Sequence, residues 1–351
     1  MRLPRLEAIK NALLENLRRP RGYVALAHDF FLDILLQCGD LEEFMGWLRG
    51  VSGRGGGNVV IKVAEVTRGG CAANTASALA SLGVPVVLYG KTSGLGMQIL
   101  KRFFTGLPVD LQFSTGGELG FTVSLEGAVG GRRVNIMLTH LGANADFAFR
   151  DISEEGLRRL GEARALMLTS YWGNARRLEF AQQTLQYAKE SGVEYTVIDT
   201  GDPVPHHADV DELVRLLNSG CVDRISLNEN EARHYASHIA RRPMENLVEC
   251  CRLIHEETGV DVDLHHAECA LTITGGRETA IPTYRVEVRR LTGAGDAWNA
   301  GNILGLLLGL NDGERLLLAN AVAGFYISNP TPKHPNMEEV REFVKKSELR
   351  A

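Results

Sequence analysis

Residues 165–228 contain three short apolar runs, ALMLTSY (165–171), YTVID (195–199) and RISLN (224–228), with a helical pattern between each pair. A further run, ALTIT (270–274), follows another helical pattern near 229–239. Continuous apolar strands that alternate with helices are typical of a parallel sheet covered on both faces. The sequence therefore predicts an α/β fold, with a doubly wound, mostly parallel sheet flanked by helices.

The region before this alternation has a different pattern. Residues 109–139 alternate apolar and polar side chains around Gly-rich turns, which is typical of β-hairpins. Together with NVVIKVAEV (58–66), they predict a small β-sheet lid with strands drawn from about 58–68 and 109–140. The first strand of the main sheet is expected at YVALA (23–27), after an amphipathic surface helix at 5–18. We therefore expect a helical extension over 1–22 and one domain over 23–345.

Composition narrows the class of protein. The 351 residues are 44% hydrophobic and 23% charged, with a net charge of -5, so nothing in the charge suggests a nucleic-acid partner. No apolar run approaches the roughly 18 residues of a membrane span, and the N-terminus lacks the apolar core of a signal peptide. The six cysteines form no C-x-x-C pair, and we expect them to be reduced. These features favour a cytoplasmic protein that binds neither nucleic acid nor membrane.

The motif with the clearest chemistry is LTGAGDAWNAG (291–301), a Gly-rich turn that opens a long apolar helix. Free N–H groups in a first helical turn, helped by the helix dipole, bind anions. An acid in that turn, Asp296, is placed to act as a base for a hydroxyl that attacks a phosphate. The alternative is that Asp296 only caps a buried helix, since Asp is common in first turns.

Three further patterns have both a functional and a structural interpretation. The stretch NENE (228–231) at a strand-to-helix junction predicts a site for the water shell of a metal, or a capping box. The stretch GGCAAN (69–74) predicts either close approach of a ligand to the backbone or a tight turn with an Asn cap. Asp29 and Asp33 follow the first strand and are either acceptors for hydroxyl groups or solvated loop acids.

Taken in order, these motifs resemble the ribokinase-like (PfkB) carbohydrate kinases. GGCAANTASALASLG (69–83) is similar to the first family signature, and RLTGAGDAWNAG (290–301) is similar to the second. SLNENEA (226–232) resembles the Asn-x-x-Glu magnesium motif, and HDFFLD (28–33) resembles the segment whose last acid holds substrate hydroxyls. The resemblance covers roughly residues 23–335.

The resemblance implies a kinase that transfers the γ-phosphoryl of ATP to a hydroxyl of a sugar, sugar phosphate or nucleoside, with Mg²⁺. It also implies a lid that excludes water and pairs two copies of the chain. The residue roles it implies are Asp296 as the base; Gly293, Ala294 and Gly295 as the anion hole; Asp33, Gly69, Gly70 and Asn74 for the substrate; Asn228 and Glu231 for Mg²⁺ through water; and Asn228, Thr274, Gly275, Gly276, Thr292 and Asn320 for the nucleotide.

One residue departs from the family pattern. Arg290 stands where the family usually has an Asp that helps to hold a monovalent cation. Because a guanidinium cannot ligate a cation, we expect an enzyme that needs no potassium; the alternative is a solvated residue at a strand end. Other readings of the whole chain are a catalytically silent sugar-binding or regulatory protein on the same fold, and an ADP-dependent kinase. The sequence does not name the substrate.

Overall fold

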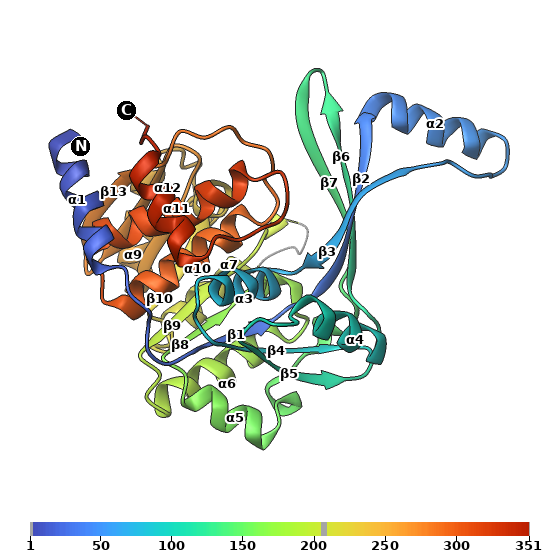
Figure 1. Ribbon diagram of the computed structural model, residues 1–351. Coiled ribbons are helices and arrows are strands. Elements are labelled where there is room, and N and C mark those ends of the chain that lie inside the picture. The colour runs from blue at the N-terminus through green and yellow to red at the C-terminus, as the bar shows by residue number, and fades with distance from the viewer. Residues whose placement is uncertain (1–2, 205–208, 351) are drawn as a thin grey trace.

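A nine-stranded sheet forms the body of the protein (Figure 1). The computed structural model describes residues 3–204 and 209–350. The strands run in the order β13-β12-β11-β10-β9-β8-β1-β4-β5, and the seven from β11 to β5 are parallel. The predicted α/β, doubly wound fold is therefore confirmed. The strands are β1 (Val24–His28), β4 (Val86–Thr92), β5 (Val109–Thr115), β8 (Ala165–Leu168), β9 (Tyr195–Asp199), β10 (Arg224–Asn228), β11 (Asp261–His265), β12 (Cys269–Thr274) and β13 (Arg277–Pro282).

Helices cover both faces of this sheet (Figure 1). They are α1 (Leu3–Asn16), α3 (Cys71–Ser81), α4 (Gly94–Phe103), α5 (Glu154–Gly161), α6 (Arg177–Glu190), α7 (Val210–Leu217), α8 (Glu229–Ala240), α9 (Leu247–Thr258), α10 (Ala294–Leu308), α11 (Asp312–Ser328) and α12 (Met337–Lys346). The strands separate two apolar clusters, one beneath α3, α10 and α11 and the other beneath α6 to α9. Helix α10 is buried from Asp296 to Leu308, which explains why its sequence is apolar on all sides.

The N-terminal helix belongs to the body. Leu6, Leu13 and Leu17 are buried in the same apolar cluster as α10 and α11. Arg341 of α12 donates a hydrogen bond to the carbonyl oxygen of Leu14 at 2.8 Å. The helix expected near 5–18 is thus present, at Leu3–Asn16, and it packs against the body of the protein.

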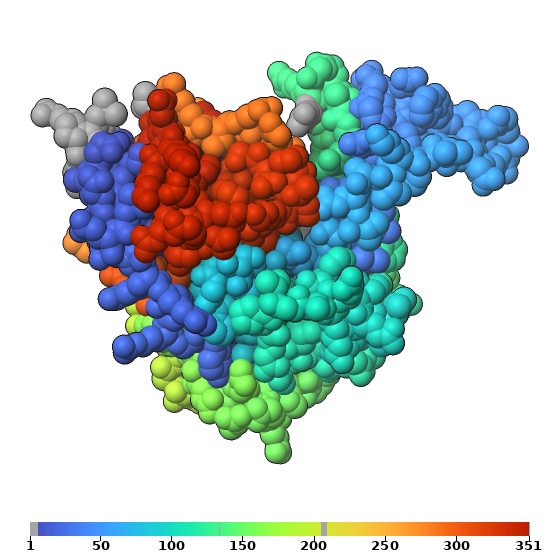
Figure 2. All heavy atoms as spheres, viewed as in Figure 1, coloured from blue at the N-terminus to red at the C-terminus, as the bar shows by residue number. Residues whose placement is uncertain are grey.

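The lid is a four-stranded sheet in the order β3-β2-β6-β7. Its strands are β2 (Phe31–Asp40), β3 (Lys62–Gly69), β6 (Phe121–Val129) and β7 (Arg132–His140), and Figure 2 shows it projecting from the body. One expectation needs correction: residues 109–115 pair with β4 at the edge of the main sheet and are not part of the lid. Residues 31–40, where the sequence predicted no strand, form the lid strand between β3 and β6.

A helix extends the lid away from the body (Figure 1). Helix α2 (Leu41–Gly53) begins directly after β2, where the Asp40 side chain accepts a hydrogen bond from the N–H of Glu43 at 3.0 Å. The Gly-rich stretch after it leads into β3, which begins at Lys62, four residues later than predicted. Among the described residues, no helix is both long and apolar enough to cross a membrane.

Candidate active site

A glycine turn brings Asp296 to the start of helix α10. Gly293 precedes the helix with a φ of +86°, a conformation that favours glycine. A Cβ on Gly293 would also lie only 2.7 Å from the hydroxyl oxygen of Tyr326. Conformation and crowding both require glycine here. The Asp296 side chain in the first turn is consequently buried, with 8% of the residue exposed.

Helix α3 supplies the partner of this carboxylate. Asn74 Nδ2 donates a hydrogen bond to Asp296 Oδ2 at 3.0 Å, although the two residues are 222 positions apart. Burial raises the pKa of Asp296 well above its ordinary value, and the nearby carboxylate of Asp199 adds to this, while the Asn74 amide opposes it. A raised pKa makes the ionised carboxylate a stronger proton acceptor. Two motifs that are far apart in the sequence therefore meet at one group.

The N–H groups of the glycine turn differ in their availability. The Ala294 N–H donates to the carbonyl oxygen of Leu291 at 3.0 Å, so it is already bonded within the turn. The N–H groups of Gly293 and Gly295 have no acceptor among the described residues. The predicted anion hole thus retains two of its three donors, next to Asp296 and at the positive end of the helix dipole.

Gly69 and Asp33 fit together at the base of the lid. A Cβ on Gly69 would lie 2.0 to 2.2 Å from the carboxyl atoms of Asp33, so the glycine makes room for that side chain. Asp33 is 5% exposed, and its Oδ1 is enclosed without a hydrogen-bond partner. Burial raises the pKa of Asp33 to about 7. A buried acceptor without a partner is expected to be satisfied by a ligand or by water.

The other acid after β1 has a structural role. Asp29 accepts hydrogen bonds from the N–H groups of Cys71 and Ala72 at 2.9 and 2.7 Å, which caps helix α3. Two hydroxyl groups from the loop after β8 also donate to its carboxylate. Gly70 packs on the same residue, since a Cβ there would lie 2.7 Å from the Asp29 carbonyl oxygen. Of the two candidate acids, only Asp33 has an oxygen free for a hydroxyl group.

Asn228 and Glu231 form a capping box at the start of α8, which the sequence predicted as the alternative to a metal site. Asn228 donates to both Glu231 oxygens, from Nδ2 at 2.8 Å and from its N–H at 2.9 Å, and its Oδ1 accepts from the Glu231 N–H at 3.0 Å. Burial raises the pKa of Glu231 well above its ordinary value, and Asp199 adds to the shift. Burial likewise raises the pKa of Asp199 to about 6. Glu231 and Asp199 are thus two buried carboxylates whose negative charges repel each other. A divalent cation bound nearby would offset that repulsion.

The side chains available as metal ligands limit how such a cation can be bound. Within the described ranges, no group of three or more His, Cys, Asp or Glu side chains is arranged to bind a metal directly. Mg²⁺ commonly keeps several waters and uses one or two carboxylates plus phosphate oxygens. Asn228, Glu231 and Asp199 therefore fit a cation bound through water and a ligand phosphate, and the capping box holds the Glu231 carboxylate in place for it.

Comparison with known proteins identifies the family of the chain. The model of the pfkB family carbohydrate kinases matches residues 51–339, well over half of the chain. The chain belongs to the pfkB carbohydrate kinase family. Among curated proteins, a ketohexokinase from Haloferax volcanii is 27% identical over 248 residues, covering 67% of this chain. The match spans 64% of the length of that relative.

Solved structures share the fold of this pfkB-family chain. An adenosine kinase from Sinorhizobium meliloti has a TM-score of 0.72 at 23% identity, covering 89% of this chain and 95% of its own. A ribokinase from Arabidopsis thaliana, solved with ribose and ATP, has a TM-score of 0.72 at 20% identity, covering 92% and 99%. At these identities the likeness shows the fold alone.

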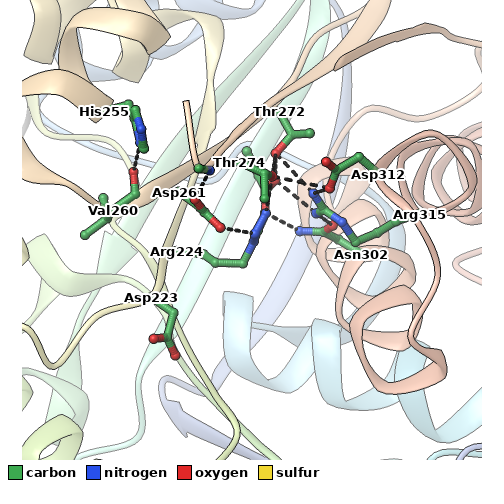
Figure 3. Close-up of polar contacts among 12 residues, drawn as sticks. Asp223, Arg224, His255, Val260, Asp261, Thr272, Thr274, Asn302, Asp312 and Arg315 are labelled. Carbon is green, nitrogen blue, oxygen red and sulfur yellow. Dashed lines mark hydrogen bonds and ion pairs between the residues drawn. The ribbon is translucent and has the colours of Figure 1, made fainter. Parts of the chain in front are cut away.

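The structure corrects the predicted nucleotide turn of this pfkB-family chain. Thr274, Gly275 and Gly276 follow β12, which is antiparallel to β11, so they lie at the edge of the sheet opposite Asn228 and Asp296. The Thr274 hydroxyl accepts a hydrogen bond from Arg224 at 2.9 Å, and the Gly275 N–H donates to Asp261 at 3.0 Å (Figure 3). These residues close a β-hairpin and bind the neighbouring strands. They do not reach the candidate site.

His265 is the site residue that the sequence reasoning missed. It ends β11 at the carboxyl edge of the sheet, beside Asn228 in register. A Cβ on Gly295 would lie 3.1 Å from His265 Cε1, so the imidazole packs against Gly295 of the predicted anion hole. Burial lowers the pKa of His265 to about 4, and the ring is therefore neutral. The alternation of DVDLH (261–265) is a sequence signal for a strand that ends at His265. Its two aspartates, however, are unusual in a buried strand, so the strand was not predicted.

The other two predicted nucleotide residues have partners inside the protein. Asn320 Oδ1 accepts from the Trp298 indole N–H at 3.0 Å, and its Nδ2 donates to the carbonyl oxygens of Ile281 and Pro282. Asn320 is thus a packing residue of α11. The Thr292 hydroxyl accepts a hydrogen bond from Asn135 of the lid at 2.9 Å. That contact joins the lid to the glycine turn.

Proposed function

We propose that this protein is an ATP-dependent kinase that transfers the γ-phosphoryl group to a hydroxyl of a sugar, sugar phosphate or nucleoside. The observation that carries the proposal is the buried Asp296 carboxylate, held by Asn74 beside two free N–H groups at the start of α10. A base of raised pKa beside an anion hole is what phosphoryl transfer to an alcohol requires. Membership of the pfkB family supports the same reaction class.

In this mechanism each group has one task. Asp33, whose Oδ1 lacks a partner, accepts hydrogen bonds from substrate hydroxyls and orients the acceptor. Asp296 takes the proton of the attacking hydroxyl, and Asn74 keeps the carboxylate in position. The N–H groups of Gly293 and Gly295 stabilise the negative charge that develops on the phosphoryl oxygens. Mg²⁺, when bound near Asn228 and Glu231, supplies further charge neutralisation.

The lid has two tasks in the proposal. It excludes water, which competes with the substrate hydroxyl as a nucleophile. It also pairs two copies of the chain through its exposed apolar side chains, which include Val63, Val66, Met137 and Leu138. The cytoplasm is the proposed location.

A coupled phosphotransfer assay tests the reaction. Mg-ATP and Mg-ADP are offered with a panel of pentoses, hexoses, sugar phosphates and nucleosides to the wild type, Asp296→Asn and Asp211→Asn. Asp211 is a matched control because it is an exposed acid on α7. We expect transfer from ATP to one class of acceptor, a loss of at least 100-fold in Asp296→Asn, and no change in Asp211→Asn.

The other outcomes separate the competing functions. Transfer from ADP alone identifies an ADP-dependent kinase. No transfer from either donor, together with a rise in melting temperature on adding a sugar, identifies a silent binding protein. Full activity of Asp296→Asn would overturn the assignment of the base.

A further inference from the structure

A cavity on the surface of the protein lies near the candidate active site. It has a volume of about 390 Å³, is open to solvent, and is bordered by the end of β3, helix α3, the loop after α11 and the start of α12. In Figure 2 the red C-terminal segment meets the blue and cyan residues of β3 and α3 in this part of the molecule. None of the described residues that line this cavity is predicted to bind the substrate, the nucleotide or the metal. The polar residues that line it are Arg68, Ser77, Ser81, Lys333, His334, Asn336 and Glu339.

Arg68 brings a positive charge without a counter-ion to this cavity. Its Nε is enclosed with no hydrogen-bond partner, and no ion pair within the described chain includes it. The nearby carboxylate of Glu65 pairs instead with Arg290, at 2.9 Å. Burial lowers the pKa of Arg68, and the Arg290 charge acts in the same direction. Arg68 is half-buried, and a cation that has lost part of its hydration without gaining a partner is destabilised, so an anion in the cavity would stabilise it.

The remaining lining groups add hydrogen-bond donors. His334 is 5% exposed, and its Nδ1 has no partner. The Asn336 Oδ1 is used to cap α12, which leaves its NH₂ group as a donor. The serine hydroxyls of α3 contribute two more donors. The one carboxylate that lines the cavity, Glu339, is already bonded to Lys333 and to the Asn336 N–H.

We propose that this cavity binds a phosphate group, either inorganic phosphate or the phosphate of a small phosphomonoester. The planar fork of a guanidinium matches two phosphate oxygens, and charge-assisted bonds of this kind are the strong ones. The volume is within the range of small-molecule sites, so it has room for the organic part of a phosphomonoester. The donors come from three separate parts of the chain, which the anion would hold together.

The cavity contacts the glycine turn through one aromatic pair. The His334 ring stacks on Tyr326 with centroids 4.7 Å apart and an interplanar angle of 12°. The Tyr326 hydroxyl donates to the Thr292 carbonyl oxygen at 3.1 Å and lies against Gly293. A phosphate that fixes His334 therefore also fixes Tyr326 and the turn that presents Asp296. We expect it to tighten nucleotide binding in the active site.

Titration calorimetry tests the site with inorganic phosphate and with glycerol 3-phosphate, at matched ionic strength, using glycerol as the blank. The variants are Arg68→Met and, as a matched control, Arg252→Met, which removes an exposed charge on α9. All titrations are repeated with a saturating non-hydrolysable ATP analogue and Mg²⁺, which occupies the active-site anion hole. Ser81→Glu, which places a carboxylate in the cavity, provides a second test if Arg68→Met does not fold.

We expect binding to persist with the analogue present, to weaken on the order of tenfold or more in Arg68→Met or Ser81→Glu, and to be unchanged in Arg252→Met. Nucleotide affinity should rise when the probe is present. Equal affinity for both probes identifies inorganic phosphate as the ligand, and tighter binding of glycerol 3-phosphate identifies a phosphomonoester. The proposal is overturned if neither probe binds, if the analogue displaces both, or if Ser81→Glu binds as well as the wild type.

Discussion

Replacing Gly69 with Ala should displace the carboxylate of Asp33, which we propose binds the substrate, without disturbing the backbone. The φ of Gly69 lies outside the range that favours glycine, so alanine can adopt it. The obstacle is Asp33, because the new Cβ would lie 2.0 to 2.2 Å from its carboxyl atoms. A normal contact needs more than 3 Å, so the carboxyl group must move by about 1 Å or more.

The size of the effect follows from that displacement. Misplacing a substrate-positioning group by about 1 Å can cost on the order of 100-fold. Losing a hydrogen bond to a charged group costs about 1.5–3 kcal/mol, which is roughly 10- to 150-fold. We therefore expect kcat/KM for the acceptor to fall about 100-fold in Gly69→Ala, while the melting temperature changes little.

The assay is steady-state phosphotransfer with the acceptor found in the panel. Gly46→Ala on α2 is the matched control, since a Cβ there has nothing within 4 Å. A double-mutant cycle with Asp33→Ala isolates the cause: once the carboxylate is gone, Gly69→Ala should cost nothing more. A Gly69→Ala enzyme within twofold of the wild type, or a loss that persists in the Asp33→Ala background, would refute the reasoning.

Three further predictions follow from buried charges. Asp263 is fully buried; although burial alone would raise its pKa, Arg224 and Arg315 hold that pKa well below the ordinary value. Asp263→Asn should therefore lower the free energy of unfolding in urea by about 3–5 kcal/mol, and a loss under 1 kcal/mol would contradict this. Because the pKa is depressed in the folded state, the stabilisation is present above the unfolded pKa of about 4 and is lost as pH falls below it, which acid unfolding of wild type and variant will show. The pKa of Asp33, raised by burial to about 7, predicts that the acceptor KM decreases as pH rises through 7, and a flat KM profile from pH 6 to 8 would argue against the carboxylate as the hydroxyl acceptor. Arg290 pairs with Glu65 and lies over the Tyr326 ring, so activity should be the same in potassium and in choline chloride, and strong activation by potassium would contradict it.

The sequence predicted β1, β8, β9, β10 and β12 because these strands are mostly apolar. It missed β11 and β13, which contain charged residues, and it misplaced a strand whose environment is mixed. Residues 109–115 alternate because they form the edge strand β5, which is half-buried, and an edge strand has the same pattern as a lid strand. No strand was predicted at residues 31–40, where Asp33 interrupts the apolar run, yet that acid is buried inside the lid strand.

The candidate site was predictable where glycine and helix starts define it. Gly69, Gly293 and Asp296 have the predicted relation to turns and helices, because positive φ angles and close contacts leave few other residues. The nucleotide turn was misplaced because two hairpin-like turns follow each other, at His266–Glu268 and at Thr274–Gly276. Only strand direction shows which of them faces the site, and strand direction depends on long-range pairing.

The joint between lid and body has a mechanical consequence. The chain passes from β1 to β2 through Asp29 and Phe30, and Asp29 is bonded to the start of α3, where β3 returns to the body. The Asn144 amide, just after β7, bonds both the N–H and the carbonyl oxygen of Phe30. Three of the segments that connect the lid to the body, those after β1, β3 and β7, are thus hydrogen-bonded to one another at one place. We expect this place to act as the hinge of the lid. We expect any swing of the lid to carry Asp33 and the start of α3 with it, so that the motion that excludes water also moves Asp33 and Asn74, the hydrogen-bond partner of Asp296.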